Sequence, residues 1–199
     1  MIEKKGILVP TDFSKPAFSA LEYAIYIANR RDLPIYLLHI ADKSKLREKI
    51  EERDEYRNRI AALYNKLEQL KNKSGGAFRI KTFLILSDES ISEEIIAFGE
   101  KMETTLCFMG TFGGSYSASK IRIGTNTGKV VSDAPFPVAT SFTTKKPISF
   151  KNLLLPIDFT KHTHEKVERI IYFAKDYDSK CICLPHQNFW KNSLLLMIN

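Results

Sequence analysis

Short apolar runs alternate along the chain with longer segments in which apolar residues recur every three or four positions. The short runs predict five β-strands, at residues 6–9, 35–40, 78–86, 105–109 and 138–140. The longer segments predict four helices, at residues 16–31, 43–73, 91–102 and 125–134. Strands and helices that alternate at this spacing imply right-handed crossovers, and therefore an α/β fold with a parallel sheet covered by helices on both faces.

The pattern begins again near the C-terminal end of the sequence. Residues 7–14 read ILVPTDFS and return as LLLPIDFT at residues 153–160, an offset of 146 positions. Aligned without gaps, residues 153–184 match residues 7–38 at 11 of 32 positions. The chain therefore reads as a tandem repeat with an incomplete second copy.

We accordingly predict a complete domain at residues 1–142, a linker at 143–151 and a partial second repeat at 152–199. The second copy is expected to begin with a β-α-β unit: a strand at 152–156, a helix at 161–178 and a strand at 181–184. So short a segment buries too little apolar surface to form its own core. We expect it to dock on the first unit or on a partner chain.

Composition places the chain among ordinary globular proteins, since 44% of its 199 residues are apolar and 27% are charged. No apolar run reaches the ~18 residues that span a bilayer, and the N-terminal residues lack the features of a signal peptide. Three cysteines make no disulfide framework, and free thiols fit a reducing compartment. We expect a cytoplasmic protein without a membrane segment.

The formal net charge of +7 raises the question of nucleic-acid binding. In the most charged stretch, residues 42–59, seven basic residues stand among six acidic ones. Interspersed charges of both signs are typical of a solvated helix with ion pairs at i,i+4. They are less typical of a basic surface that binds the phosphates of a nucleic acid. We do not expect nucleic-acid binding. Nor do we expect a metal site, because Cys181 and Cys183 align with the apolar Ile35 and Leu37 and read as buried strand residues.

In an open parallel sheet, ligands bind beyond the carboxyl ends of the strands where the strand order reverses, so the loops after strands one and four are the candidates. Asp12 follows strand one, in a turn restricted by Pro10. The aspartate could contact a ribose or an adenine amine, or it could cap the next helix, for which Ser14 is the better candidate. His39 ends the second strand, where a satisfied core histidine is a better reading than a catalytic base.

The loop after strand four is rich in glycine. It reads Met109-Gly110-Thr111-Phe112-Gly113-Gly114, and the next helix opens with Gly124-Thr125-Asn126-Thr127. Glycines let the backbone approach a phosphate, and the N–H groups at a helix N-terminus bind anions. A packing or turn role for the glycines is an equal alternative on spacing alone.

Taken together, these segments resemble the universal stress protein family. The resemblance lies in Pro-x-Asp after strand one, Met-Gly-x2-Gly after strand four, Gly-Thr-Asn-Thr at the last helix and Pro-x-Val-Ala into strand five. It covers residues 2–142 and the start of a second copy. It implies a five-stranded parallel sheet sandwiched by helices, like that of the adenine nucleotide alpha hydrolases. It also implies a homodimer formed through the last strand.

The resemblance further implies ATP or another adenine nucleotide as ligand, which Mg²⁺ could accompany, and no stable metal. By position, adenosine would meet Asp12, Ile40 and Met109, while the ribose and phosphates would meet the glycine loop and the helix that follows it. The full set of expected binding residues is Pro10, Thr11, Asp12, Ile40, Met109, Gly110, Gly113, Gly114, Gly124, Thr125 and Asn126.

One spacing departs from the family pattern. The nucleotide-binding branch has nine residues between the second glycine of Gly-x2-Gly and the next glycine, whereas ten residues separate Gly113 from Gly124. The extra residue could be absorbed at Gly114, or it could misplace the loop. We therefore expect a non-catalytic, nucleotide-binding stress protein, with an interaction module that binds no nucleotide as the alternative. An enzyme is not expected, because no Walker loop, pyrophosphatase loop or acid/base pair occurs at the strand ends.

Overall fold

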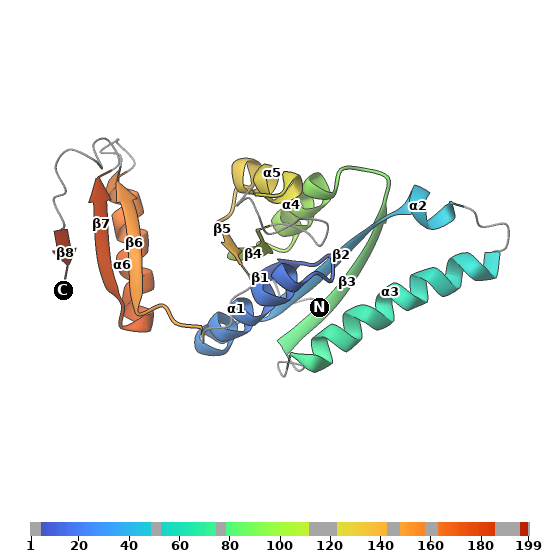
Figure 1. Cartoon of the computed structure of the whole chain (residues 1–199), viewed down its shortest axis with the longest axis horizontal. Helices are drawn as coiled ribbons and strands as arrows, with labels where there is room; N and C mark the ends of the chain where they lie inside the picture. Colours follow the sequence, from blue (N-terminus) through green and yellow to red (C-terminus); the bar gives the residue numbers. More distant parts are fainter. Residues whose placement is uncertain are drawn as a thin grey trace. The chain divides into compact units, whose positions relative to one another are not determined.

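The computed structural model describes residues 5–48, 53–74, 79–111, 123–142, 148–157, 163–185 and 196–198. The chain divides into two compact units, Met1–Lys145 and Lys146–Asn199, and each is considered by itself (Figure 1).

The first unit is built on a five-stranded parallel sheet, as the alternation of elements predicts. Its strand order is β3-β2-β1-β4-β5, with β1 at Ile7–Pro10, β2 at Ile35–Asp42, β3 at Ile80–Ser87, β4 at Leu106–Gly110 and β5 at Val138–Ser141. Strand β1 lies in the middle, and its apolar side chains are wholly buried because helices cover both faces. The order reverses between β1 and β4, so the carboxyl ends of these two strands define the switch point.

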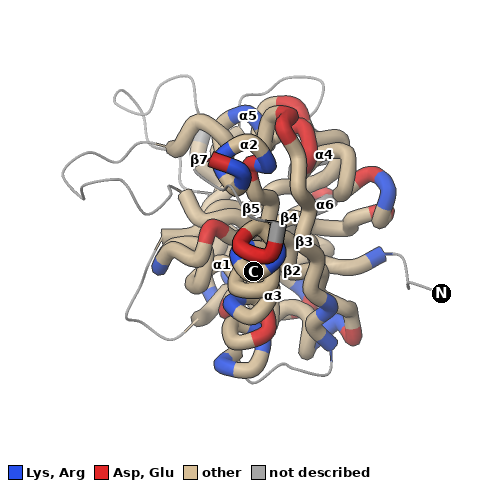
Figure 2. Tube along the Cα trace, turned by 90° about the vertical axis from the view of Figure 1, so that its right-hand side faces the viewer, with Lys and Arg blue, Asp and Glu red and all other residues tan. Residues whose placement is uncertain are grey.

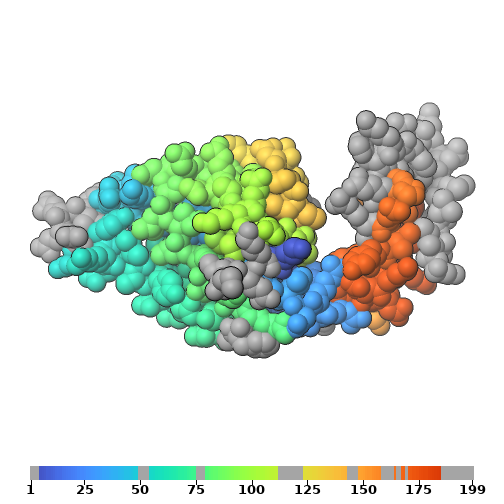
Figure 3. Space-filling model, turned by 180° about the vertical axis from the view of Figure 1, so that it is seen from behind, coloured from blue at the N-terminus to red at the C-terminus, as the bar shows by residue number. Residues whose placement is uncertain are grey.

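Helices cover the sheet in two layers, as right-handed crossovers require. Helices α1 (Lys15–Arg31) and α3 (Arg53–Lys73) lie on one side of the sheet, and α4 (Ile91–Lys101) and α5 (Thr125–Asp133) lie on the other (Figure 1). Helix α4 packs against α5, and their atoms form one continuous surface, green and yellow in Figure 3. The switch point therefore lies between α1 on one side and α4 and α5 on the other.

The sequence predicts one long helix over residues 43–73, and this prediction is wrong. Helix α2 is short (Lys43–Arg47), and Glu48 has extended backbone angles, φ −60° and ψ 128°. Arg59 of α3 donates hydrogen bonds to the carbonyl oxygens of Leu46 (3.4 Å) and Glu48 (3.2 Å). These bonds satisfy carbonyl groups that the end of a helix leaves without partners, so Arg59 stabilises the end of α2.

Glycines allow close packing inside the unit. Gly99 of α4 faces the ring of Phe136, and a Cβ added there would lie 2.4 Å from two ring carbons. Gly110, at the end of β4, lies close to the first turn of α1: an added Cβ would be 2.8 Å from the Ala17 nitrogen and from the Pro16 carbonyl carbon. Both positions exclude any larger residue without movement of neighbouring atoms.

The second unit contains β6 (Asn152–Ile157), α6 (Thr163–Tyr177) and β7 (Lys180–Pro185), the β-α-β order that the repeat predicts. Strands β6 and β7 are parallel, and β8 (Leu196–Ile198), which the sequence analysis did not predict, pairs antiparallel with β7. Cys181 and Cys183 are buried free thiols, as expected of strand residues.

Charged residues of both signs are interspersed along α3 (Figure 2). Several form pairs one turn apart, such as Arg59 with Glu55 at 2.9 Å and Lys71 with Glu68 at 3.2 Å. This is the solvated helix that the mixed charge pattern indicates. Among the described helices we find none with the length and apolar character that a membrane span requires.

Candidate functional site

A cavity of about 420 Å³ lies at the carboxyl ends of β1, β2 and β4. That size lies within the range of small-molecule sites. Sixteen residues line it: Pro10, Thr11, Asp12, Ser14, Ala17, Leu38, His39, Ile40, Ile91, Ile95, Met109, Gly110, Gly124, Thr125, Asn126 and Thr127. The cavity is therefore at the switch point, where the topology predicts a ligand.

Nine of the eleven residues that the sequence analysis selected line this cavity. They come from the ends of β1, β2 and β4 and from the start of α5, which are far apart in sequence. The other two, Gly113 and Gly114, lie outside the described residues. The structure thus brings together the parts of the predicted site that it describes.

The turn after β1 is held by one backbone hydrogen bond to β2 and by hydrogen bonds to its own side chains. The Thr11 N–H donates to the Leu38 carbonyl (2.8 Å), the Ser14 N–H donates to Asp12 Oδ1 (3.0 Å), and the Ala17 N–H donates to Ser14 Oγ (3.4 Å). Ser14 is the N-cap of α1, as the sequence analysis favoured. Asp12 instead forms a short turn with Ser14 and lies at the wall of the cavity.

The opposite wall is the N-terminus of α5. Gly124 is its N-cap and has no side chain with which to cap the helix. Thr127 Oγ1 donates to the Gly110 carbonyl at 3.0 Å, which fixes the helix against the end of β4. The first N–H groups of a helix have no partner within the helix, and the helix dipole adds partial positive charge at this end. This wall therefore suits an anion.

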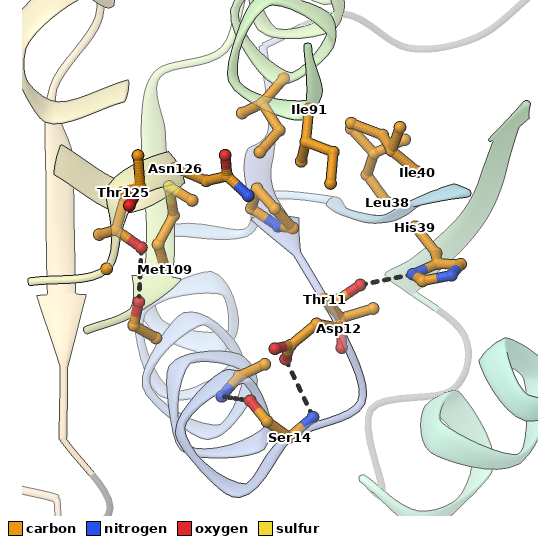
Figure 4. Close-up of a pocket in the computed structure, with 16 residues that line it drawn as sticks. Thr11, Asp12, Ser14, Leu38, His39, Ile40, Ile91, Met109, Thr125 and Asn126 are labelled. Carbon is orange, nitrogen blue, oxygen red and sulfur yellow. Dashed lines mark hydrogen bonds between the residues drawn. The ribbon is translucent and has the colours of Figure 1, made fainter. Parts of the chain in front are cut away.

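The cavity has an apolar side, a mixed side across from it and a polar turn (Figure 4). Leu38, Ile40 and Ile91 gather on one side, Met109 and Asn126 lie across from them, and the polar turn of Asp12 closes a third side. Such a cavity can hold a flat apolar group next to a polar or charged one.

His39 is the titratable residue that sequence reasoning placed in the core and not in the site. Its Nδ1 lies 2.7 Å from the Thr11 carbonyl oxygen, and its ring contacts the Phe13 ring, with centroids 4.5 Å apart. Burial lowers the pKa of His39, and Lys66 acts in the same direction, whereas the Thr11 bond and Asp12 oppose the shift. The Nδ1 hydrogen bond agrees with a satisfied histidine. His39 is half-buried, however, and lines the cavity, so it is not the core residue that the sequence analysis expected.

Six further lining residues escaped the sequence analysis as ligand contacts: Ser14, Ala17, Leu38, Ile91, Ile95 and Thr127. Ile91 and Ile95 are spaced one turn apart in α4. Helical periodicity therefore predicts that they share an apolar face of the helix, but not that this face lines the cavity. Among the described residues, no group of three or more histidine, cysteine, aspartate or glutamate side chains could hold a metal ion.

Comparison with protein families identifies the chain. Residues 4–140 match the model of the universal stress protein family. The chain belongs to this family. The match ends close to the end of the first unit, so the second unit as a partial universal stress protein repeat stays a prediction from the sequence.

Solved structures give the same fold. One is the hypothetical protein MJ0577, whose structure served for a structure-based assignment of its biochemical function. It is 24% identical over 73% of this chain and 100% of its own, with a TM-score of 0.60. A universal stress protein from Archaeoglobus fulgidus in complex with dAMP is 18% identical over 69% of this chain and 97% of its own, with a TM-score of 0.52. A further universal stress protein, in complex with cAMP, is 15% identical over 72% of this chain and 100% of its own, with a TM-score of 0.52. No curated protein matches the sequence.

Proposed function

We propose that the cavity binds an adenine nucleotide and that the protein acts as a non-catalytic, nucleotide-responsive member of the universal stress protein family. The observation that carries the proposal is the meeting of Asp12, Ile40, Met109 and the start of α5 around one cavity at the switch point. Two universal stress proteins of this fold have been solved with dAMP and cAMP.

Each part of the nucleotide has a matching surface. The isoleucine and methionine side chains suit the faces of adenine, and the Asp12 carboxylate can accept hydrogen bonds from an amine or a ribose hydroxyl. The N-terminus of α5, where the N-cap residue Gly124 has no side chain, suits the phosphates. Mg²⁺ would accompany the phosphates of ATP and would not need a protein cage of its own.

The proposal assigns no catalytic step to this protein. Among the described residues, the titratable side chains that line the cavity are Asp12 and His39. Each is hydrogen-bonded to a backbone group of the turn after β1. Slow or absent hydrolysis of ATP is the expected outcome. We expect the cytoplasm as the compartment, which suits the three free cysteines.

Isothermal titration calorimetry with ATP, ADP, AMP and cAMP tests the binding. Asp12→Ala should weaken binding by ~1–3 kcal/mol, the scale of an unmade buried hydrogen bond. Asp12→Asn is the matched control for the turn, because it keeps an acceptor for the Ser14 N–H but replaces one carboxylate oxygen by a donor. If Asp12 contacts the ligand, the Asn variant should also bind weakly while unfolding like the wild type.

Gly124→Val tests the phosphate wall. Gly124 has φ −62° and ψ 152°, angles that any residue adopts, so valine introduces a side chain without backbone strain. If Gly124→Val loses affinity for the nucleotide but keeps its stability, the result supports binding of the phosphates at the N-terminus of α5. A wild type that binds none of the four nucleotides overturns the proposal and favours the second function, an interaction module with an empty site. The ten-residue glycine-loop spacing is the observation that favours this second function.

We also propose that the protein forms a homodimer through β5. This strand lies at one edge of the sheet, and an unpaired edge is a template for another strand. Phe142, which follows β5, and Val131, on α5, are 45% and 46% exposed, so apolar surface lies near that edge. Analytical ultracentrifugation should detect a dimer that Phe142→Glu weakens. A wild type that stays monomeric at micromolar concentrations would refute the dimer.

A further inference from the structure

The turn after β1 contains a residue in an unfavourable backbone conformation. Phe13 has φ +64°, in the left-handed region that residues with a Cβ seldom adopt. Such a conformation persists where surrounding contacts over-determine it. The contacts of Phe13 therefore show what holds the turn that carries Asp12.

Three contacts hold the turn around Phe13. Its N–H donates to Thr11 Oγ1 at 3.0 Å, its ring packs on the His39 ring, and the Lys66 ammonium of α3 lies 5.8 Å from its ring centroid. His39 Nδ1 also donates to the Thr11 carbonyl oxygen at 2.7 Å. His39 thus contacts both residues that flank Asp12 in the chain.

The hydrogen bond defines the chemical form of His39. A carbonyl oxygen can only accept, so Nδ1 must carry the hydrogen. The charged groups that act on the imidazole are Asp12 in the turn and Lys66 on α3. Burial favours the neutral form of the imidazole, so its second nitrogen, Nε2, carries no proton at neutral pH. His39 therefore contributes two contacts to the turn: the Nδ1–H bond to Thr11 and the packing of its ring on Phe13.

We propose that His39 is a positioning residue that holds the Thr11–Phe13 turn so that the Asp12 carboxylate meets the ligand. Figure 4 shows the imidazole at the rim of the cavity, joined to Thr11, while Asp12 lies on the cavity side of the same turn. His39 acts on the ligand through Asp12 and not by touching the phosphates. This inference rests on the proposed nucleotide binding.

Two variants of the full chain separate the hydrogen bond from the bulk of the ring. His39→Leu fills similar space without a donor, and His39→Asn places an amide N–H near the position of Nδ1. The Leu variant should bind AMP about five- to tenfold more weakly, the scale of one lost hydrogen bond. The Asn variant should stay within about threefold of the wild type. Leu84→Ala, at the register neighbour of His39 on β3, controls for loss of stability beside the turn.

A double variant tests the route of the effect. If His39 acts through Asp12, His39→Leu combined with Asp12→Ala should bind AMP no more weakly than Asp12→Ala alone. Additive losses, or Leu and Asn variants that are equally weak, would overturn the positioning role.

Amide hydrogen exchange makes the inference independent of binding. The N–H groups of Phe13 and Ser14 are bonded inside the turn, so both should exchange faster in His39→Leu and not in His39→Asn. If the wild type binds no nucleotide yet the two His39 variants show this exchange pattern, the proposed function fails and the positioning of the turn stands. Unchanged exchange in the Leu variant refutes the positioning.

Discussion

Gly110→Ala, at a residue that lines the cavity, and Gly128→Ala, inside α5, are the same chemical change, yet the structure predicts opposite effects on stability. At Gly110 a Cβ would lie 2.8 Å from two backbone atoms of α1 and 2.9 Å from Pro16 Cβ. At Gly128, inside α5, the nearest atom is Ile123 Cγ2 at 3.8 Å, an ordinary contact. The first site must move to accept a methyl group and the second need not.

The magnitudes follow from these distances. Overpacking against atoms that cannot rotate away destabilises by ~1–3 kcal/mol, while the reduced freedom of the unfolded chain returns only ~0.4–1 kcal/mol. Gly110→Ala should therefore lower the free energy of unfolding by ~1–2 kcal/mol. Gly128→Ala should raise it by ~0.5–1 kcal/mol, because alanine is the better helix former.

Urea unfolding followed by circular dichroism measures both variants. We expect the urea midpoint of Gly110→Ala to lie below that of the wild type and the midpoint of Gly128→Ala to lie above it, with unchanged m-values. A neutral or stabilised Gly110→Ala variant would refute the packing argument, because β4 and α1 would then have room for a Cβ. The variant also separates two roles of Gly110: if the glycine serves packing alone, the alanine variant should bind nucleotide as the wild type does wherever it remains folded.

Three further expectations concern titratable groups. Burial raises the pKa of the Cys107 thiol, so thiol reagents should label it only after unfolding, and fast labelling of the native protein would contradict its burial. The hydrogen bond from Ser44 helps to lower the pKa of Asp42 to about 2. The stability that the ionised Asp42 contributes should be lost as the pH falls from the ordinary pKa of an aspartate toward that value, and carboxyl NMR should show a higher pKa of Asp42 in Ser44→Ala. Proton NMR should find the pKa of His39 below its ordinary value and higher in Lys66→Met, since Lys66 lowers it; protonation should destabilise the native state as pH falls below ~6.5, and no upward shift in the variant would refute this coupling.

The sheet could be predicted from the sequence because each of its strands is a short apolar run between turn signals. The break between α2 and α3 could not. The chain from Lys43 to Lys73 keeps a helical apolar pattern and has no glycine or proline before its C-terminal end. In the structure the Arg59 guanidinium donates to the carbonyl oxygens of Leu46 and Glu48, which stabilises the end of α2. A surface arginine gives no sequence signal for such a long-range contact.

The candidate site was predicted where it depends on strand ends and missed where it depends on helix faces. Asp12 and Gly124 follow from the rule that ligands bind at the carboxyl ends of parallel strands. Ile91 and Ile95 line the cavity because of the direction in which α4 crosses the sheet, which no local pattern encodes. His39 was identified as a satisfied residue, but its partner, the Thr11 carbonyl, is defined only when β1 and β2 pair.

The extra residue in the glycine loop can be judged from the ends of that loop. The Gly124 N–H donates to the Thr111 carbonyl at 2.8 Å, and the Thr111 N–H donates to the Ser141 carbonyl at 3.0 Å. The two described ends are therefore bonded to each other and to β5 in a chain that carries the extra residue. One added residue changes the closure entropy of such a loop very little, so Gly110, Gly124 and the start of α5 keep their places around the cavity. The spacing then affects only those ligand contacts made within residues 112–122, and nucleotide binding by the wild type decides whether those contacts are essential.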